Sequence, residues 1–369
     1  MVFRANSKDI HKLLSSVFPA VPGRTTLQIL EKFLVETDSG LLTVTASDEQ
    51  IRLKASIPVE SDQNIAAVID AKFLLDLVSS FQDTTVTCQK ESDTQLILKT
   101  DTGNYEVSYS SADEYPPLKV DDQDTIIELD GQVLKSAIDT GAFAITKGAM
   151  RVAMQGMSVE LTDAGLRFVM TDGHRLVKIV KNNIIFENED QFTIPERAVT
   201  VLPKILHDGA ISIRMNKRSA HFKLGAVELF TRLIDEKFPD YNSVIPVQNE
   251  NHLFLNREAL LRSIERMLIF RSGAQPLVKL TIEADSVEVS SEDIDRGSNA
   301  KDVLPCNYQG TPMTIGFNTT YLRDVLTHIR AAEVVIKMST PSRAAVIEPA
   351  VQPEDENLLM LLMPLRLNV

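Results

Sequence analysis

The densest group of chemically active side chains in the sequence is the run Thr171-Asp172-Gly173-His174-Arg175. A histidine beside an aspartate can act as a general base, but catalysis also requires a nucleophile or a metal ion and a group that orients the base. The chain contains no G-x-S-x-G, H-E-x-x-H or C-x-x-C motif and no glycine-rich phosphate loop. Asp-Gly is also a common hairpin dipeptide. We therefore favour a turn or a binding surface here, with a hydrolase that uses His174 and Asp172 as the alternative.

The chain repeats one amphipathic helix pattern three times. The last copy has four apolar residues at the i, i+3, i+4 and i+7 spacing of one helix face, with Asn318 suited to the N-cap: Leu322, Val325, Leu326 and Ile329. The same face occurs 124 residues earlier and again another 124 earlier, as Ala198, Val201, Leu202 and Ile205 and as Leu74, Leu77, Val78 and Phe81. The run at residues 171–175 lies inside the second copy of the repeated unit.

A second helix pattern recurs at nearly the same offsets. Its apolar residues are Ile10, Leu14 and Val17, then Leu134 and Ile138, then Leu260, Ile264 and Met267. A fixed period of this size indicates repeated structural units, each about as long as one domain. We predict three domains at residues 1–123, 124–249 and 250–369. The alternative is that amphipathic helices in a long chain match at some offset by chance.

Each predicted domain also contains strand-like segments. The segment from Ile51 to Ile57 alternates apolar and polar residues, which is the pattern of a half-buried β-strand, and turn residues separate it from the strands before it. The order helix, strands, helix, strands predicts an α+β fold with antiparallel sheets. Such sheets expose unpaired edges, which tend to bind other strands. Closure of the units into a ring would cover the edges at their ends.

The composition predicts a soluble globular protein. Hydrophobic residues make up 44% of the chain and charged residues 24%, and no apolar run is long enough to cross a bilayer. The N-terminus shows no signal peptide. Cys88 and Cys306 lie in different predicted domains without metal-ligand spacing, so we expect reduced, buried thiols in a cytoplasmic protein that holds no metal or cofactor. A net charge of −13 argues against a basic DNA-binding domain.

Four motifs, in order along the whole chain, carry a resemblance to a known family. They are Thr171 to Leu176, Phe238-Pro239-Asp240-Tyr241, Ile315 to Asn318, and Met363 to Leu367. Together they resemble the bacterial DNA polymerase III beta subunit family, the sliding clamps. The resemblance implies three repeated domains of the DNA clamp fold, with antiparallel sheets outside and helices lining a ring that is a head-to-tail homodimer. It also implies sheets that continue across domain boundaries.

The resemblance answers the objection from charge, because a ring holds DNA topologically and needs Lys and Arg only on its inner helices, where they meet phosphates. The predicted DNA-facing residues are Arg24 and Arg197, which match a DNA-contacting and a basic position of the family, and Lys147, Arg151 and Lys204, which we infer from helix placement. In the alternative interpretation each is an ordinary surface charge. Val152-Ala153 stands where the best-known members carry aromatic residues, so the side chains that could stack on single-stranded DNA are missing.

By the same resemblance, partner proteins dock a short peptide rich in Gln, Leu and Phe into one pocket per chain. The pocket residues carry over as Met154, Thr171, Gly173, His174, Arg175, Leu176, Pro239, Val244, Leu361, Leu362, Met363, Pro364 and Leu365. Leu, Met and Val supply adaptable apolar area, and a few polar groups orient the ligand. In the alternative interpretation, Arg175 and Arg366 are structural ion-pair partners and the Met-rich tail is ordinary core. The resemblance places the dimer contact at Tyr105 and Val107 in the first domain and at Leu268 and Ile269 in the third, where ordinary core is again the alternative.

We predict a non-enzymatic processivity factor that encircles duplex DNA without sequence preference. It is expected to tether the catalytic subunit of DNA polymerase III and other proteins that carry a clamp-binding motif. An ATP-dependent clamp loader must open the ring, because the chain has no nucleotide-binding loop. We expect no association with membranes. Besides the hydrolase, the remaining alternative is a monomeric peptide-binding scaffold without a role on DNA.

Overall fold

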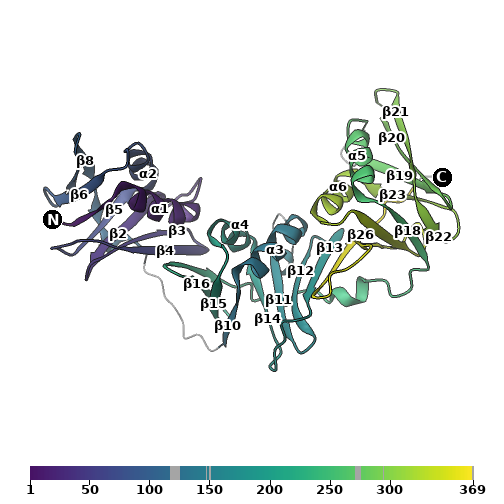
Figure 1. Cartoon of the computed structure of the whole chain (residues 1–369), viewed down its shortest axis with the longest axis horizontal. Helices are drawn as coiled ribbons and strands as arrows, with labels where there is room; N and C mark the ends of the chain where they lie inside the picture. The colour runs from purple at the N-terminus through teal and green to yellow at the C-terminus, as the bar shows by residue number, and fades with distance from the viewer. Residues whose placement is uncertain (117–124, 147, 149–150, 271–275, 294, 368–369) are drawn as a thin grey trace. The chain divides into compact units, whose positions relative to one another are not determined.

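The computed structural model describes residues 1–116, 125–146, 148, 151–270, 276–293 and 295–367. The chain divides into two compact units, Met1–Lys135 with Arg197–Leu233 and Ser136–Glu196 with Ile234–Val369. Each unit contains one four-stranded and one nine-stranded antiparallel sheet (Figure 1). The two units are described separately below.

The first unit is built on two sheets. Its four-stranded sheet has the order β1 (Phe3–Asn6), β6 (Thr85–Lys90), β7 (Gln95–Lys99), β8 (Asn104–Ser108). Its nine-stranded sheet has the order β10 (Thr125–Asp130), β15 (Ala210–Met215), β16 (Ser219–Leu224), β17 (Val227–Arg232), β4 (Ile51–Pro58), β3 (Leu41–Ser47), β2 (Lys32–Asp38), β5 (Ile65–Asp70), β9 (Ser110–Ser111). Helices α1 (Ser7–Val17) and α2 (Ala71–Ser79) pack side by side in this unit (Figure 1). Short 3₁₀ turns are η1 (Phe18–Ala20), η2 (Gln28–Glu31) and η3 (Ala112–Glu114).

The second unit repeats this plan. Its nine-stranded sheet has the order β14 (Asp190–Pro195), β11 (Gly156–Thr162), β12 (Gly165–Thr171), β13 (Arg175–Lys181), β26 (Glu356–Leu362), β25 (Ala345–Pro349), β24 (Glu333–Met338), β18 (Asn251–Asn256), β22 (Asn307–Gln309). Its four-stranded sheet has the order β21 (Ser298–Pro305), β20 (Ser286–Asp293), β19 (Leu277–Ile282), β23 (Met313–Asn318). The helices are α5 (Arg257–Met267) and α6 (Thr319–His328), with 3₁₀ turns η4 (Ala142–Ala144), η5 (Val152–Met154) and η6 (Tyr241–Val244). Two further helices, α3 (Gly131–Gly141) and α4 (Glu196–Ile205), contain residues of both units.

Helix α6 shows why the predicted helices form. The side-chain oxygen of Asn318 accepts hydrogen bonds from the backbone N–H groups of Thr320 and Tyr321. Such an N-cap satisfies donors that the first turn of a helix leaves free. The predicted apolar face is at most 1% exposed, in Leu322, Val325, Leu326 and Ile329. The structure therefore confirms both the helix and its cap.

The predicted alternating strand is confirmed as β4. Ile51, Leu53 and Ala55 point into the core and are at most 3% exposed. The dipeptide Asp172-Gly173 forms the turn between β12 and β13, as predicted, and Gly173 has a φ of +86°. That left-handed conformation costs glycine little and other residues more, which explains why glycine occupies the turn.

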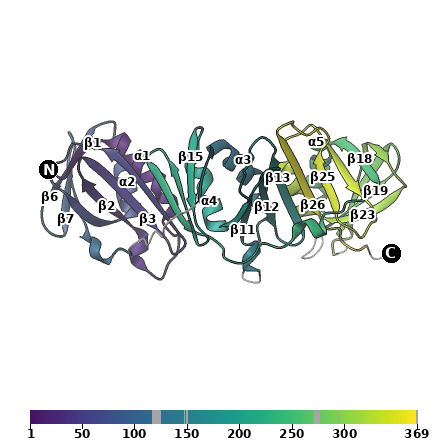
Figure 2. The same ribbon diagram turned by 90° about the horizontal axis from the view of Figure 1, so that it is seen from below.

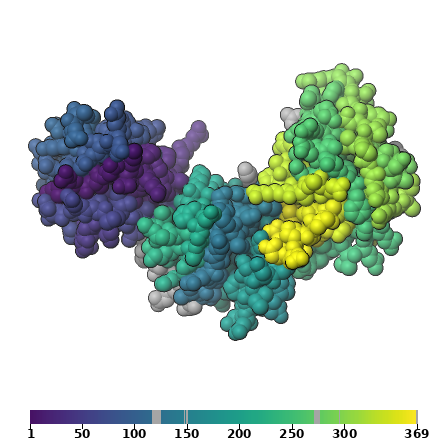
Figure 3. Space-filling model, in the orientation of Figure 1, coloured from purple at the N-terminus to yellow at the C-terminus, as the bar shows by residue number. Residues whose placement is uncertain are grey.

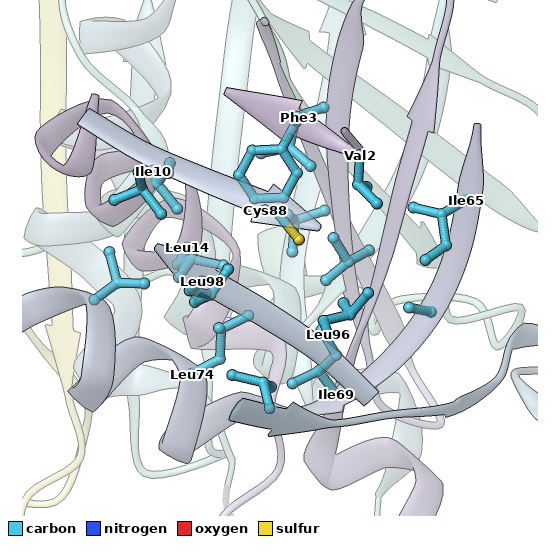
Figure 4. Close-up of a pocket in the computed structure, with 17 residues that line it drawn as sticks. Val2, Phe3, Ile10, Leu14, Ile65, Ile69, Leu74, Cys88, Leu96 and Leu98 are labelled. Carbon is cyan, nitrogen blue, oxygen red and sulfur yellow. The ribbon is translucent and has the colours of Figure 1, made fainter. Parts of the chain in front are cut away.

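The core of the first unit lies between α1, α2 and the two sheets. A cavity of about 30 Å³ remains in it, lined only by apolar side chains such as Leu14, Leu74 and Leu98 and by Cys88 (Figure 4). A space of this size holds about one water molecule, and apolar walls offer it no hydrogen bonds. The cavity is therefore a packing defect and not a ligand site.

Many strands belong to three-stranded antiparallel meanders, among them β2-β3-β4, β15-β16-β17, β11-β12-β13 and β24-β25-β26. In each nine-stranded sheet, the third strands of two such meanders pair with each other. In the first unit the third strand β4 pairs with the third strand β17. In the second unit β13 pairs with β26, and Figure 2 shows these two strands side by side. We call these pairings the first and the second junction. The third strands β8 and β21 lie at the ends of their sheets, and no described strand pairs with their outer edges. The expectation that sheets continue from one meander into the next is confirmed at both junctions.

The two compact units do not coincide with the three predicted domains. The reason is that the nine-stranded sheets each join strands from two of those domains, for example β4 of the first to β17 of the second. The boundaries at residues 123 and 249 stay a prediction, and the first of them lies outside the described residues.

Candidate functional site

The turn between β12 and β13 is held by the side chain of Asp172. Its Oδ1 accepts hydrogen bonds from the backbone N–H groups of His174 at 2.9 Å and Arg175 at 3.0 Å. The hydroxyl of Thr171 donates to the carbonyl of Arg175 at 2.8 Å and accepts from the N–H of Gly173 at 3.1 Å. Four hydrogen bonds within five residues make this turn a fixed platform.

Arg175 connects the turn to two other elements. Its Nε donates to Asp172 Oδ2 at 3.0 Å, its Nη1 to Asp324 Oδ2 in α6 at 2.7 Å, and its Nη2 to the carbonyl of Phe143 at 2.7 Å. The rings of Phe143 and Tyr321 lie 4.9 Å and 4.4 Å from its Cζ, which is within cation–π range. The side chain is 11% exposed. Arg175 therefore has a structural role in this turn, and its place in the pocket stays a prediction.

The geometry does not assemble the catalytic pair of the hydrolase hypothesis. Both carboxylate oxygens of Asp172 are engaged by backbone N–H groups and by Arg175. The ring of His174 stacks near that of Tyr321, with centroids 6.0 Å apart, and in the part of the chain that the structure describes it makes no hydrogen bond to a carboxylate. An exposed histidine without an orienting partner is a poor general base.

An apolar cluster lies beside this turn. Its buried members are Val169, Leu176, Phe238, Tyr241, Ala344 and Leu361, with Ile245 and Leu359 half-buried against them. Exposed apolar residues follow these members closely in the chain, including Pro239, Val244 at 55% exposure and Met363 at 40%. The N–H of Met363 donates to the carbonyl of His174 at 2.8 Å, which ties the C-terminal segment to the turn. That segment lies at the surface in Figure 3, in yellow. We call the cluster and these exposed residues the apolar patch.

Tyr241 fixes one side of the apolar patch. Its hydroxyl donates to Glu160 Oε2 at 2.9 Å, and burial, followed by the nearby Glu160 carboxylate, raises the pKa of Tyr241 to about 12. The Nζ of Lys178 lies 5.5 Å from the centre of its ring. The Tyr241 ring is thus fixed by the hydrogen bond of its hydroxyl to Glu160 and by Lys178 over its face.

Most of the predicted pocket residues gather at the patch or its turn. Thr171, Gly173, His174, Arg175 and Leu176 form the turn, and Pro239, Val244, Leu361 and Met363 line the patch. Met154 is 3% exposed, and the carbonyl of Met154 accepts from the N–H of Thr146. Pro364 and Leu365 continue from Met363, and Leu365 forms a bridge to Gly316.

Leu362 is also predicted for the pocket. It is fully buried, and as the neighbour of Leu361 in strand β26 it points to the opposite face of the sheet. Its side chain is therefore buried on the face away from Leu361, and its place in the pocket stays a prediction.

Sequence reasoning missed several residues that build the site. They are Phe143, Tyr321 and Asp324, which surround Arg175, and Phe238 and Tyr241, which line the patch. Tyr321 and Asp324 are three residues apart on α6, off its apolar face, so they share a second face of that helix. This spacing is a signal that could have identified them.

At the first junction, Asp48 makes the same turn hydrogen bonds as Asp172 makes at the second. Asp48 stands 124 positions before Asp172. Asp48 Oδ1 accepts from the N–H groups of Gln50 and Ile51, both at 2.8 Å, as Asp172 does at the second junction. Its Oδ2 accepts from Arg197 Nε at 2.6 Å, and Arg197 Nη2 donates to the carbonyl of Pro19 at 2.9 Å. Pro19 stands 124 residues before Phe143. We call the guanidinium contacts of Arg175 and Arg197 the two guanidinium locks.

The first junction has Arg52 at the position that Leu176 holds at the second. Arg52 pairs across β4·β17 with Phe230 as Leu176 pairs with Leu361 across β13·β26. Its guanidinium lies 5.9 Å from the ring centre of Tyr115 and donates to the carbonyl of Pro116. Burial lowers the pKa of Arg52. A charged stack thus occupies the place that Leu176 fills at the apolar patch.

The predicted DNA-facing residues differ in their surroundings. Arg24 is exposed and lines a recess of about 560 Å³ with residues that include Thr25, Thr26 and Gln50. Arg151 and Lys204 are exposed. Lys147 lies outside the described residues. Arg197 also lines the recess, but its side chain is 27% exposed and is held by Asp48, so it is not a free cation.

The predicted dimer residues lie in or close to β8 and β21, whose outer edges no described strand pairs with. Tyr105 and Val107 are in β8, and Leu268 and Ile269 follow α5, which packs on β21. Ile269 is 69% exposed, whereas Val107 is 1% exposed. The side chain of Val107 therefore belongs to the core, and only its backbone edge is open to a partner.

Two features are absent from the residues that the structure describes. No helix there is long and apolar enough to span a bilayer. No group of three or more His, Cys, Asp or Glu side chains there could hold a metal ion.

Comparison with family models gives three matches that cover most of the chain in order. Residues 1–119 match the N-terminal domain of the DNA polymerase III beta subunit, residues 128–240 its central domain, and residues 242–366 its C-terminal domain.

Comparison with individual proteins gives full-length relatives. The Bacillus subtilis protein named beta sliding clamp is 27% identical over 99% of this chain and 100% of its own length. The crystal structure of the DNA polymerase III subunit beta from Pseudomonas aeruginosa matches with a TM-score of 0.94 at 24% identity, over all of both chains, and so shares the fold. The sliding clamp of Bartonella birtlesii, solved bound to griselimycin, matches with a TM-score of 0.92 at 26% identity over 99% of both chains.

Proposed function

The chain belongs to the family of DNA polymerase III beta subunits, and on that premise we propose that it is a sliding clamp which closes around duplex DNA as a head-to-tail dimer. It has the three-domain DNA clamp fold of the family and no catalytic role of its own. As a processivity factor it keeps the replicative polymerase on DNA without reading sequence.

One structural observation carries the proposal for a closed ring. The first and second junctions pair the third strand of one meander with the third strand of the next, and β8 and β21 are the two third strands left over. Strand β21 has no buried residue, whereas its counterparts β4 and β13 each have three. An exposed edge of this kind is a template for another strand. Pairing β21 of one copy with β8 of a second would repeat the junction and close the ring.

Positive charge for the DNA would come from individual residues, because the chain as a whole carries −13. We assign phosphate contacts to Arg24, Arg151 and Lys204, which are exposed, and keep Lys147 as a prediction. Arg197 is left out of this set, since its guanidinium already holds Asp48 and the carbonyl of Pro19. Contacts of this kind are made to the backbone of DNA and carry no sequence information.

The apolar patch is the proposed docking site for partner peptides. Its buried floor at Leu176 and Leu361, with the exposed Val244 and Met363 beside it, suits a short apolar segment. The fixed turn at residues 171–175 offers backbone and side-chain polar groups to orient that segment. The partners would be the catalytic subunit of DNA polymerase III, an ATP-dependent clamp loader and other proteins with a similar motif. We place this activity in the cytoplasm, where bacterial chromosomes are replicated.

The test is retention on nicked circular DNA after loading by a matching clamp loader with ATP. Labelled protein should stay on the circle and be lost after one restriction cut, because linear DNA lets a ring slide off. Retention after the cut would mean direct binding and would overturn the ring. Failure to load, together with a monomer in solution, would favour the peptide-binding scaffold.

A further inference from the structure

This inference rests on the proposed docking site and concerns what a partner peptide carries beside its apolar residues. Strand β13 continues past the floor of the apolar patch: Leu176 belongs to that floor, and Lys178 stands two residues further along the same strand. Successive residues of a strand point to opposite faces, so Lys178 lies on the face of the sheet that bears the patch. Its side chain is half-buried there.

Three members of the apolar patch surround Lys178. Val169 in β12 and Leu359 in β26 are its partners across the two neighbouring strands. The ring centre of Tyr241 lies 5.5 Å from its Nζ. A lysine among apolar neighbours keeps its alkyl chain against them and its ammonium at the rim. Lys178 is therefore the charged end of the apolar patch.

The ammonium of Lys178 has no carboxylate of its own among the residues that the structure describes. The nearby carboxylate of Glu160 is already engaged by two other groups. Its Oε2 accepts a hydrogen bond from the Tyr241 hydroxyl at 2.9 Å and lies 3.6 Å from Nη1 of Arg167. Two positive charges, on Lys178 and Arg167, thus share one negative charge on Glu160.

The surroundings of Lys178 destabilise its charge. Burial, followed by the guanidinium of Arg167, lowers the pKa of Lys178, and Glu160 opposes this only in part. A lowered lysine pKa means that the ammonium is disfavoured relative to the neutral amine. An anion that reaches the ammonium removes this penalty, and its attraction is stronger when a bound peptide excludes water from the site. The anion that the side chains of a peptide carry is a carboxylate.

We propose that Lys178 selects partner peptides that carry an Asp or Glu beside the apolar segment, and that the carboxylate of this residue pairs with the Lys178 ammonium. The strand geometry places the acidic residue. Leu176 and Lys178 are two strand residues apart, roughly 7 Å, and an extended peptide covers this distance with about two residues. The acidic residue therefore stands within about two positions of the apolar residue that packs on Leu176. The apolar contacts supply affinity, and the ion pair distinguishes one partner from another.

The experiment measures the binding of matched fluorescent peptides to the full chain by polarisation. Each peptide is rich in Gln, Leu and Phe and carries either Glu or Gln at one of the two positions on either side of its apolar segment. Both ends are blocked by acetylation and amidation, so that the Glu side chain supplies the carboxylate. At one or more of these positions the Glu peptide should bind the wild type about threefold or more tightly than its Gln partner. The preference should shrink in 1 M NaCl, because salt screens an ion pair.

Substitutions of Lys178 then assign the preference to this residue. Lys178→Met should abolish the preference for Glu over Gln, Lys178→Glu should reverse it, and Lys178→Arg should keep it, because the preference follows the charge at this position. Lys279→Met is the matched control. Lys279 is an exposed lysine in β19 of the four-stranded sheet, and its loss changes the net charge by the same amount. The control should therefore keep the wild-type preference.

The outcomes separate this inference from the proposed docking site. A wild type that binds none of the peptides would overturn the docking site itself. Equal affinities for the Glu and Gln peptides at every position, or a preference that survives Lys178→Met, would overturn the role of Lys178 alone. A gain that a free C-terminal carboxylate gives and Glu does not would overturn an acidic side chain as the partner. The comparison on the wild type decides the matter even where a variant fails to fold.

Discussion

Arg175 Nη1 lies 2.7 Å from Asp324 Oδ2, which joins strand β13 to helix α6 across 149 positions of the chain. Both side chains are less than one fifth exposed. Arg175→Ala should lower the free energy of unfolding by about 3 kcal/mol, because it leaves Oδ2 of Asp172 and Oδ2 of Asp324 without their charged donor. Urea denaturation followed by circular dichroism measures this.

The same carboxylate provides a matched control. Arg323 Nη2 contacts Asp324 Oδ1 at 2.7 Å, but the Arg323 side chain is 40% exposed. Exposed ion pairs contribute little, so Arg323→Ala should cost under about 1 kcal/mol. Equal losses from the two variants would contradict a special role for Arg175.

Val244 should contribute to peptide binding without contributing to stability. It is 55% exposed beside Tyr241 of the apolar patch, so Val244→Asp leaves the core intact but sets a charge against an apolar ligand. We expect at least about a tenfold loss of affinity for a fluorescent peptide rich in Gln, Leu and Phe, measured by polarisation. Val247→Asp is the control, because Val247 is 96% exposed. Unchanged affinity in Val244→Asp would argue against the patch as the docking site.

Alanine substitutions at Arg24 and Arg197 should affect two different properties, DNA binding and stability. Arg24→Ala should reduce the slope of log affinity for duplex DNA against log salt by roughly 0.9, the effect of one lost phosphate contact. Arg197→Ala should leave that slope unchanged and lower the free energy of unfolding by about 2 kcal/mol, since it breaks charged hydrogen bonds to Asp48 and Pro19. Anisotropy titrations at several salt concentrations, paired with urea denaturation, measure both. A smaller salt slope in Arg197→Ala would return Arg197 to the DNA-facing set.

His221 should make the protein less stable in acid. Burial lowers the pKa of His221, and Glu228, 3.2 Å away, opposes this only in part. As pH falls below the ordinary histidine pKa of about 6.5, the unfolded chain takes up a proton that the folded chain resists, so stability is lost. The urea midpoint of the wild type should fall between about pH 7.5 and 5.5 by more than that of His221→Gln. Equal falls would mean that His221 does not titrate differently in the folded state.

The two cysteines should differ in reactivity. Cys88 is fully buried, and burial raises its pKa to about 12, so it should not react with a thiol reagent while the protein is folded. Cys306 is half-buried, and its raised pKa should make its reaction slow but measurable. Titration of native protein should give one reactive thiol, lost in Cys306→Ser, and denatured protein two. A second thiol that reacts in the native state would show that the first unit opens.

The elements were predictable because their signals are local. The apolar face of α6, its cap at Asn318 and the alternation in β4 are properties of a few neighbouring residues. The ion pair of Arg175 was not predictable in this way, because its partner Asp324 is 149 positions away and no local rule connects the two residues. The sequence allowed both a ligand role and a structural role for it.

Two side chains of the predicted site are buried, and a local signal for their burial was not used. Adjacent residues in a strand point to opposite faces, so Leu361 and Leu362 could not both line one surface. In β8, Val107 shares a face with Tyr105, whose ring packs against Phe81 at 4.9 Å, so that face is directed inward. Period-two alternation would have separated core from surface at both places.

Arg52 has a consequence for how many partner proteins the clamp binds at one time. Its guanidinium lies over Tyr115 at the first junction, where the second junction has Leu176, so the proposed docking site for an apolar peptide is the apolar patch of the second junction. In the proposed dimer, two docking sites would then serve all partner proteins. A polymerase and one other protein could bind to the ring at the same time. A third partner could bind only after one of them dissociates, so the partners would compete for the two sites.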